Sequence, residues 1–185
     1  MWSTCAVCLA FMNPAEGSIE APLTVLAELQ QKGLVRHIGL SNVTPAQIAE
    51  ARQIASIVSV QNQSNLASRT DDALIADLAG DGVAYVPFFP LGRFTPLQSA
   101  TLSDVAVHLC ATPMQIALAW LLQRSPNILV IPGTSSIEHL RENLQSSLFH
   151  IPPEVMADLD AIGTRPTGST LRRSTSLHHD RVGSR

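Results

Sequence analysis

The feature that most constrains the fold is a repeat in which an apolar, strand-like run ends in small polar or aromatic residues and an amphipathic helix follows. The four runs lie between residues 33 and 144 and read RHIGLSN (36–42), VSVQNQ (58–63), VAYVPFFPLG (83–92) and ILVIPGTSS (128–136). A helix between successive strands crosses back over the sheet, so the strands pair in parallel. An apolar run at 5–12 predicts a fifth strand.

Periodicity alone allows two architectures, an open, doubly wound α/β sheet of five parallel strands or an arc of a (β/α)8 TIM barrel. An intact barrel takes about 250 residues, whereas this chain has 185. In both folds, ligands bind where strands end and helices begin. We therefore predict a ligand site built from the strand ends: Ser41, Asn42, Gln61, Asn62, Phe88 and the turn at 132–136.

Helix starts are recognisable from their capping residues. Thr44-Pro45-Ala46-Gln47 and Thr112-Pro113-Met114-Gln115 each combine a capping threonine, a first-turn proline and a glutamine three residues on, which predicts helices over 45–55 and 113–123. Other helices are predicted over 22–32, from Asp71-Asp72 to Gly80, over 103–109, over 136–144 and from Pro152 through Ile162. One domain is expected over 1–163, followed at 164–185 by a disordered tail without apolar periodicity.

Composition narrows the class of partner. A net charge of −3 and a pI near 6.0 give no basic field to attract nucleic acid, and no apolar run approaches the roughly 20 residues that span a bilayer. An odd count of three cysteines is typical of a reducing cytoplasm. The Cys5-Cys8 pair has no second pair to complete a metal site. A small-molecule ligand, without metal, nucleic acid or membrane, is predicted.

The last strand end suits an anion, because Gly133 and the hydroxyls of Thr134 and Ser135 precede a helix N-terminus. Equally, Ser135 could simply cap that helix, with Glu138 completing a capping box. Arg141 and Asn143 follow on the first two turns.

The other strand ends suit a planar ring. Ser41-Asn42 and Gln61-Asn62 offer donors and acceptors to a carboxamide, or satisfy the loop backbone. Phe88 could stack on a ligand ring or belong to the core. His139 is expected to be structural or to face solvent.

Five segments carry a resemblance to a known family. GLVRHIGLSN, VQNQSN, PFFPLG, ALAWLLQRSPNILVIPGTSSIEHLRENL and PPEVMADLDAIG resemble, in order and spacing, the C-terminal part of the aldo-keto reductases. The PGTSS turn is similar to that of the bacterial, pyridoxal-reductase-like branch. The resemblance covers residues 18–163. It implies a partial (β/α)8 barrel carrying strands four or five to eight, and NADPH-dependent reduction of aldehydes or ketones.

The resemblance also implies roles for residues that bind NADP(H). Ser41, Asn42 and Gln61 would hold the nicotinamide carboxamide, and Phe88 would stack on the nicotinamide ring. Leu91 and Gly92 would line the pyrophosphate path. The residues expected around the adenosine 2′-phosphate and adenine are Gly133, Thr134, Ser135, Arg141 and Asn143. Many relatives have Lys-Ser at Gly133-Thr134 and Arg at His139.

Members of the family catalyse with an Asp, a Tyr, a Lys and usually a His. The only tyrosine of this chain is Tyr85 and the only lysine is Lys32, neither of which matches the motif, and the histidine position falls near Ala10. The resemblance therefore implies a truncated, catalytically impaired oxidoreductase, with a small carbonyl substrate only when complete. The alternatives are a non-catalytic nucleotide-binding module and a fragment that associates with a full-length reductase; exposed strand edges predict self-association.

Overall fold

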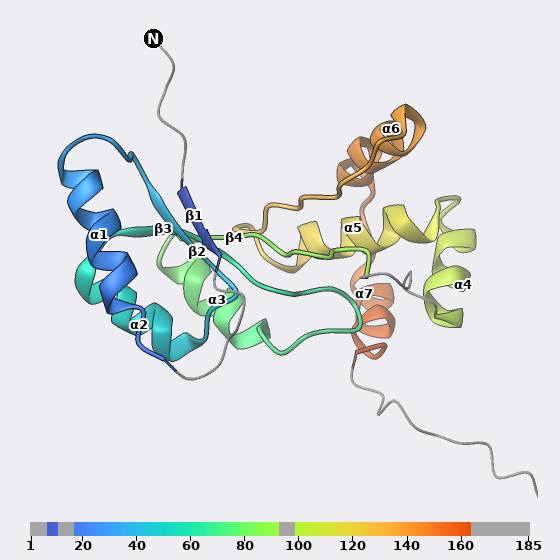
Figure 1. Cartoon of the computed structure of the whole chain (residues 1–185). Helices are drawn as coiled ribbons and strands as arrows, with labels where there is room; N and C mark the ends of the chain where they lie inside the picture. The colour runs from blue at the N-terminus through green and yellow to red at the C-terminus, as the bar shows by residue number, and fades with distance from the viewer. Residues whose placement is uncertain (1–6, 11–16, 93–98, 164–185) are drawn as a thin grey trace, which may run out of the picture.

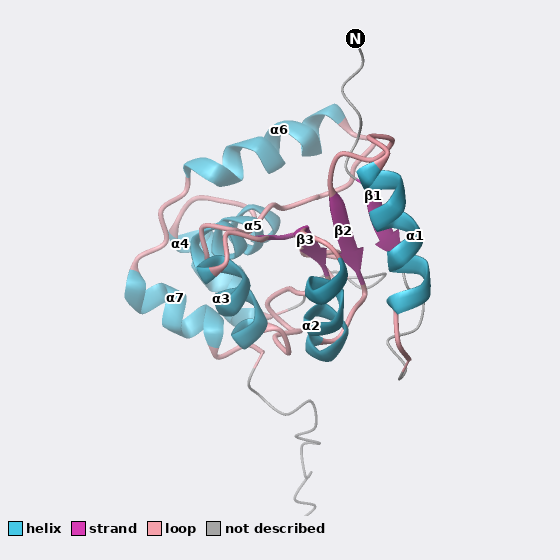
Figure 2. Ribbon diagram, turned by 90° about the vertical axis from the view of Figure 1, so that its left-hand side faces the viewer, coloured by secondary structure: helices cyan, strands magenta, loops and turns pink. Residues whose placement is uncertain are grey.

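The computed structural model describes residues 7–10, 17–92 and 99–163. Its four parallel strands form one sheet in chain order, which Figure 1 shows in cartoon form. They are β1 (Val7–Ala10), β2 (Ile38–Ser41), β3 (Ile57–Gln61) and β4 (Ala84–Tyr85). Figures 1 and 2 show α1 and α2 on the same side of the sheet. Strands in chain order with the helices on one face make an arc of a barrel, because a doubly wound sheet reverses its strand order.

A fifth strand position lies beside β4. The backbone N–H of Tyr85 donates to the Asn127 carbonyl at 2.8 Å, and the N–H of Leu129 donates to the Tyr85 carbonyl at 2.9 Å. Tyr85 and Ile128 thus form a parallel bridge. Of the strand run predicted at 128–136, only this start pairs in the described structure, and the rest is irregular.

The helices occupy the predicted places with shifted ends. Their bounds are α1 Glu20–Gln31, α2 Pro45–Ile54, α3 Asp72–Gly80, α4 Ala100–His108, α5 Pro113–Arg124, α6 Ile137–Gln145 and α7 Pro153–Asp160, with a 3-10 turn, η1, at Ser146–Leu148. Both predicted capping boxes are confirmed, at Thr44 and at Thr112.

Two helix starts differ from the prediction for physical reasons. Helix α1 begins at Glu20, two residues before Pro22, because the Glu50 carboxylate of α2 accepts hydrogen bonds from the Ser18 hydroxyl and the Ile19 N–H. Helix α4 begins at Ala100 because the Ser99 side chain caps it.

The core lies between the sheet and the helices. Ile38, Leu40 and Val60 are fully buried on the helix-facing side of the strands, and Leu23 and Leu78 cover them from α1 and α3. Alternate strand residues face the same side of a sheet, so this pattern places Ser41 and Gln61 on the other face. The core therefore fixes which side chains the strand ends present to a ligand.

A charged cluster around Trp120 joins α3, α5 and α7. The buried indole Nε1 donates to Asp160 at 2.9 Å, and the guanidinium carbons of Arg69 and Arg124 lie 5.6 and 5.3 Å from the ring centroid. Asp72 and Asp160 balance these two cations, with Arg124 2.8 Å from Asp72 and 3.1 Å from Asp160. We call these five residues the Trp120 cluster.

Some sequence predictions fall outside the described residues. The predicted tail at 164–185 and Cys5 are among them. Within the described ranges, no single helix is long and apolar enough to cross a membrane. Helices α4 and α5 pass that test together by length and composition, but they are bent by 92° at the break between them.

We expect Asp160→Ala to lower the free energy of unfolding by about 1–3 kcal/mol, because it leaves the buried Trp120 N–H unpaired and removes one of the two carboxylates that pair with Arg69 and Arg124. Urea unfolding followed by circular dichroism measures this change. The matched control is Arg52→Ala, which breaks the exposed Arg52–Asp81 pair and should cost less than about 1 kcal/mol. Equal losses in the two variants would contradict a special role for the cluster.

Candidate functional site

The ends of β2 and β3 bring three predicted site residues together. Ser41 pairs with Gln61 in the parallel register, and the Asn42 N–H donates to the Gln61 carbonyl at 2.8 Å. Asn42 has a φ of 58°, a left-handed conformation that asparagine tolerates better than most residues, and it turns the chain toward α2. All three residues are partly exposed, so each can reach a ligand at this edge.

Asn62, the neighbour of Gln61, has a structural role instead. Its side chain is 8% exposed, accepts from the Val43 N–H at 3.0 Å, and donates to the Val43 carbonyl and to Asp71, both at 2.8 Å. These bonds occupy both donor hydrogens of the amide. The structure therefore favours the alternative interpretation for Asn62, in which its amide satisfies loop backbone rather than a ligand.

Tyr85 is part of the same polar network. Its hydroxyl lies 3.0 Å from the Asp71 carboxylate to which Asn62 also donates, and its ring is fully buried. Burial, followed by the negative charge of Asp71, raises the pKa of the Tyr85 phenol well above its usual range. A phenol with a raised pKa is a weaker acid, which suits a structural residue and not a proton donor.

The raised pKa of Tyr85 predicts a loss of stability at alkaline pH. Below about pH 10, the ordinary pKa of tyrosine, the phenol is neutral in both the folded and the unfolded chain. Its full contribution to the free energy of unfolding is then present. As the pH rises further, the unfolded chain loses this proton while the folded chain keeps it, so the free energy of unfolding falls. Urea unfolding at successive pH values should show this decline in the wild type.

The variant Tyr85→Phe tests whether Tyr85 causes this alkaline loss of stability, since phenylalanine cannot ionise. The variant should lose about 1 kcal/mol at neutral pH with its hydrogen bond to Asp71, and should then decline less steeply above about pH 10. Parallel curves for the wild type and the variant would show that Tyr85 ionises alike in the folded and unfolded chain.

The segment after β4 forms a tight turn and carries three predicted residues, Phe88, Leu91 and Gly92. Phe88 bridges to Gln63 in the parallel sense, which keeps it beside the end of β3. Phe89 and Gly92 have φ values of 54° and 90°, and the Gly92 N–H donates to the Phe89 carbonyl at 3.0 Å. The partly exposed Phe88 ring meets the Phe89 ring edge to face, with centroids 5.3 Å apart. The turn places Leu91 beside the last strand end.

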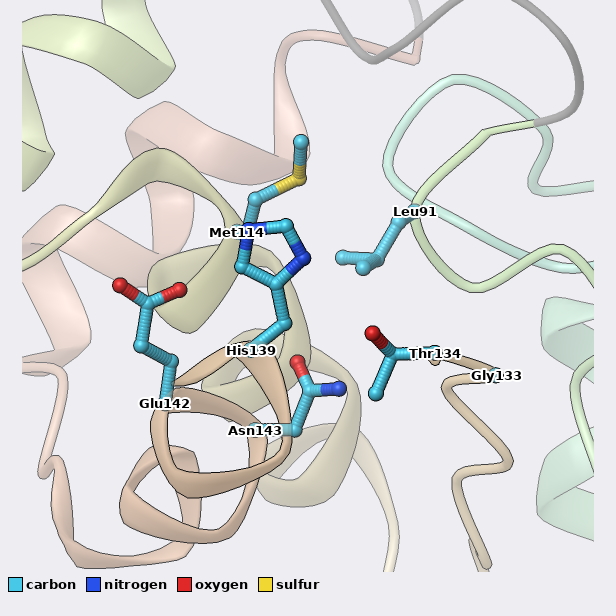
Figure 3. A pocket seen from close by; sticks show the side chains of 7 residues that line it. All are labelled: Leu91, Met114, Gly133, Thr134, His139, Glu142 and Asn143. Atoms are coloured by element: carbon cyan, nitrogen blue, oxygen red, sulfur yellow. The ribbon is translucent and has the colours of Figure 1, made fainter. Parts of the chain in front are cut away.

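A pocket of about 120 Å³ lies where this turn meets the start of α6 (Figure 3). It unites four of the residues predicted to bind a nucleotide, which come from three parts of the chain. Its lining consists of Leu91, Met114, Gly133, Thr134, His139, Glu142 and Asn143. Ser135 and Arg141 are exposed and do not line it.

Helix geometry explains which residues of α6 line the pocket. His139, Glu142 and Asn143 are spaced i, i+3 and i+4, so they share one side of the helix, whereas Arg141 is turned away from it. Sequence reasoning assigned His139 to solvent or a structural role and overlooked Met114 and Glu142. The i, i+3, i+4 spacing was the available signal for His139 and Glu142, whereas Met114 is brought in only by the packing of α5 against α6.

The start of α6 is capped by Ser136 and not by Ser135. The Ser136 hydroxyl accepts from the His139 N–H at 3.3 Å, and the Thr134 hydroxyl accepts from the Ser136 N–H at 3.1 Å. The proposed Ser135–Glu138 capping box is therefore wrong. With the cap on Ser136, the hydroxyl of Thr134 and the backbone of Gly133 lie at the mouth of the pocket.

A second cavity, of about 250 Å³, opens between the loops that follow β2 and β3, with Asn42, Thr44, Asn62 and Asp71 among its lining residues. Among the described residues, no three His, Cys, Asp or Glu side chains are grouped closely enough to hold a metal ion. The groups that the described site offers are amides, hydroxyls, the Phe88 ring, the imidazole of His139, the carboxyl group of Glu142 and a helix N-terminus. Such groups bind and orient a polar ligand.

The fold and the site define a class of protein, an arc of a parallel β/α barrel with a ligand site at the carboxyl ends of its strands. Sequence comparison gives the family: residues 7–164 match the Aldo/keto reductase family, and the chain belongs to that family.

The curated relatives are about twice as long as the matched region. The chain is 72% identical over 150 residues to a pyridoxine 4-dehydrogenase of Escherichia coli strain K12, a match that covers 81% of this chain and 52% of that protein. It is 41% identical over 139 residues to an uncharacterized oxidoreductase of Schizosaccharomyces pombe, covering 75% and 45%. The chain thus spans about half the length of the curated relatives it matches, within the pyridoxal-reductase-like branch.

Solved structures agree with a partial (β/α)8 barrel. A thermostable aldo-keto reductase in complex with the inhibitor epalrestat superposes with a TM-score of 0.76 at 34% identity, covering 85% of this chain and 59% of that one. An aldo-keto reductase of Klebsiella pneumoniae in complex with NADPH superposes with a TM-score of 0.75 at 22% identity, covering 88% and 60%, and supports the fold. The prediction of an arc of a barrel is confirmed.

Proposed function

We propose that the chain binds NADP(H) and provides the cofactor-binding part of an NADP-dependent oxidoreductase. The observation that carries this proposal is the pocket in Figure 3, where Leu91, Gly133, Thr134 and Asn143 meet at the N-terminus of α6. Family membership and the NADPH complex of the Klebsiella pneumoniae structure support it.

The nicotinamide end of the cofactor belongs at the ends of β2 and β3. Ser41, Asn42 and Gln61 offer hydroxyl and amide groups at one edge of the sheet, and such groups can both donate to and accept from a carboxamide. Phe88 lies beside the end of β3 and is partly exposed. Its ring provides a face on which the nicotinamide stacks.

The phosphate and adenosine end belongs at the last strand end. Leu91 and Gly92 line the path of the pyrophosphate, and Gly133 and Thr134 lie where the free amides and dipole of α6 favour an anion. Asn143 borders the adenine, whereas the roles of Ser135 and Arg141 stay predictions from the resemblance. His139 and Glu142 bring an imidazole and a carboxyl group to the same pocket.

We propose that this chain alone does not reduce carbonyl compounds. Its only tyrosine is buried and bonded to Asp71, and its only lysine, Lys32, is exposed at the C-terminal end of α1. Neither is part of the strand-end site. The 72% identical relative is a pyridoxine 4-dehydrogenase, which supports an alcohol of the pyridoxine type as the substrate of a complete barrel.

We also propose where the chain acts and how it associates. The chain acts in the cytoplasm, as its cysteine content indicates. In isolation, copies of it associate weakly through the open strand edges, because unpaired backbone groups at an edge favour pairing with another chain.

We expect NADPH to quench the tryptophan fluorescence of the purified chain and to raise its melting temperature. Phe88→Ala should weaken NADPH binding about fivefold, because aromatic stacking contributes roughly 1 kcal/mol. The matched control is Val107→Ala, which truncates a side chain 79% exposed on α4 and should leave the affinity unchanged. If the wild type shows neither quenching nor a thermal shift, the chain is a fragment whose role is association and not a nucleotide-binding module.

Aldehyde-dependent oxidation of NADPH should be absent from the chain alone. The reason is that neither the phenol of Tyr85 nor the ammonium of Lys32 can reach a carbonyl at the strand ends. The measurement is the loss of NADPH absorbance with a pyridoxal-type aldehyde, compared with the same assay without aldehyde. Any rate that depends on aldehyde would contradict the proposal, and loss of that rate in Tyr85→Phe would identify Tyr85 as the acid.

A further inference from the structure

We propose that two buried asparagines, Asn62 and Asn65, are positioning residues for the nicotinamide end of the cofactor. Both lie in the segment between β3 and α3, and their side-chain amides bond to the backbone of the neighbouring strand-end turns. They act through Asn42 and Phe88, the residues proposed to contact the nicotinamide. The inference rests on the proposed function, because it concerns how tightly that same site binds NADP(H).

Two residues at the proposed nicotinamide site have a left-handed backbone conformation. Asn42 has a φ of 58°, and Phe89, which follows Phe88, has a φ of 54°. Asparagine tolerates this conformation, whereas it is unusual for a bulky residue such as phenylalanine. A residue in such a sparsely populated conformation persists only where the surrounding structure fixes it. The contacts that hold these two turns therefore decide where Asn42 and Phe88 lie.

Asn62 holds the loop that begins at Asn42. Its amide oxygen accepts from the Val43 N–H at 3.0 Å, and its amide nitrogen donates to the Val43 carbonyl at 2.8 Å. The nitrogen also donates to Asp71 at 2.8 Å, which keeps the amide in this orientation. The cavity of about 250 Å³ borders the same loop, so hydrogen bonds rather than packing hold the loop on that side.

Asn65 holds the turn after β4. Its amide nitrogen donates to the Phe89 carbonyl at 3.0 Å, and the same carbonyl accepts from the Gly92 N–H. Its amide oxygen accepts from the backbone N–H groups two and three residues further on, at 2.9 and 3.0 Å. The Asn65 side chain is 3% exposed. One end of this amide thus closes the turn of its own segment, while the other end reaches the left-handed residue next to Phe88.

The segment 62–65 connects the two turns to each other. The backbone carbonyl of Asn62 accepts from the Phe88 N–H at 3.0 Å, while the Asn62 side chain holds the residue after Asn42. A ligand that contacts both Asn42 and Phe88 binds more tightly when the two are held in place beforehand, because less conformational entropy is lost on binding. Asn62 and Asn65 should therefore affect affinity for the nicotinamide and not for the adenosine.

The test compares NADPH with adenosine 2′,5′-bisphosphate, which lacks the nicotinamide. Titration calorimetry of the purified chain measures both affinities. Asn62→Ala and Asn65→Ala should each weaken NADPH binding about tenfold, because each leaves buried backbone groups of a site turn unpaired. Affinity for the bisphosphate should not change, because the pocket at α6 is lined by other parts of the chain.

The matched control is Asn127→Ala, since Asn127 also bridges two segments of backbone. Its amide nitrogen lies 2.9 Å from the Val83 carbonyl and 3.4 Å from the Ile75 carbonyl. Val83 precedes β4, so these bonds lie at the amino ends of the strands, opposite the proposed nicotinamide site. The control variant should be less stable than the wild type and should bind both probes with unchanged affinity.

Asn65→Asp separates positioning from a general loss of structure. A carboxylate still accepts from the two N–H groups of its own turn, but it cannot donate to the Phe89 carbonyl. The circular dichroism spectrum of this variant should match the wild type, while its NADPH affinity should fall as far as that of Asn65→Ala. Adding Phe88→Ala to Asn65→Asp should cost less than about twofold, against about fivefold in the wild type, because the two residues act together.

The inference is wrong, with the proposed function intact, when a wild type that binds NADPH gives any one of four results. These are unchanged NADPH affinity in both alanine variants, equal weakening of both probes, an equal loss in Asn127→Ala, or additive effects of Phe88→Ala and Asn65→Asp. A wild-type chain that does not bind NADPH would instead overturn the proposed function, and the positioning role with it. The two failures are therefore distinguishable.

Discussion

The Trp120 cluster is the interaction that holds the sheet and α3 together with helices α5 and α7. It joins the start of α3, which packs beside the sheet, to α5 and α7, through one indole flanked by two guanidinium groups and two carboxylates. Two of the elements that the cluster joins, α3 and α5, also position residues of the site. Asp71, at the start of α3, holds Asn62 and Tyr85, and α5 carries Met114 into the pocket. The four charged side chains are only partly exposed, and each is paired with a group of opposite charge.

The site divides into groups that can contact a ligand and groups that hold these in place. Neighbouring amides show the division most clearly, since Gln61 lies at the sheet edge beside Ser41 while Asn62 is committed to Val43 and Asp71. Tyr85 likewise serves structure, because burial and Asp71 raise its pKa.

Helix α6 carries two different sides. Its side that carries His139, Glu142 and Asn143 lines the pocket, and the opposite side carries Ile137, Leu140 and Leu144.

The sequence by itself determined the features that depend on bonds between near neighbours. Both capping boxes, the order of strands and helices, and the family motifs follow from residues within a few positions of one another. Only the tertiary structure decided where α1 begins, which amide is structural, and that Met114 lines the pocket, because Glu50, Asp71 and the packing of α5 on α6 act across long separations in the chain. Periodicity shows that a helix has an apolar face, whereas only the tertiary structure shows that the described residues leave that face of α6 exposed.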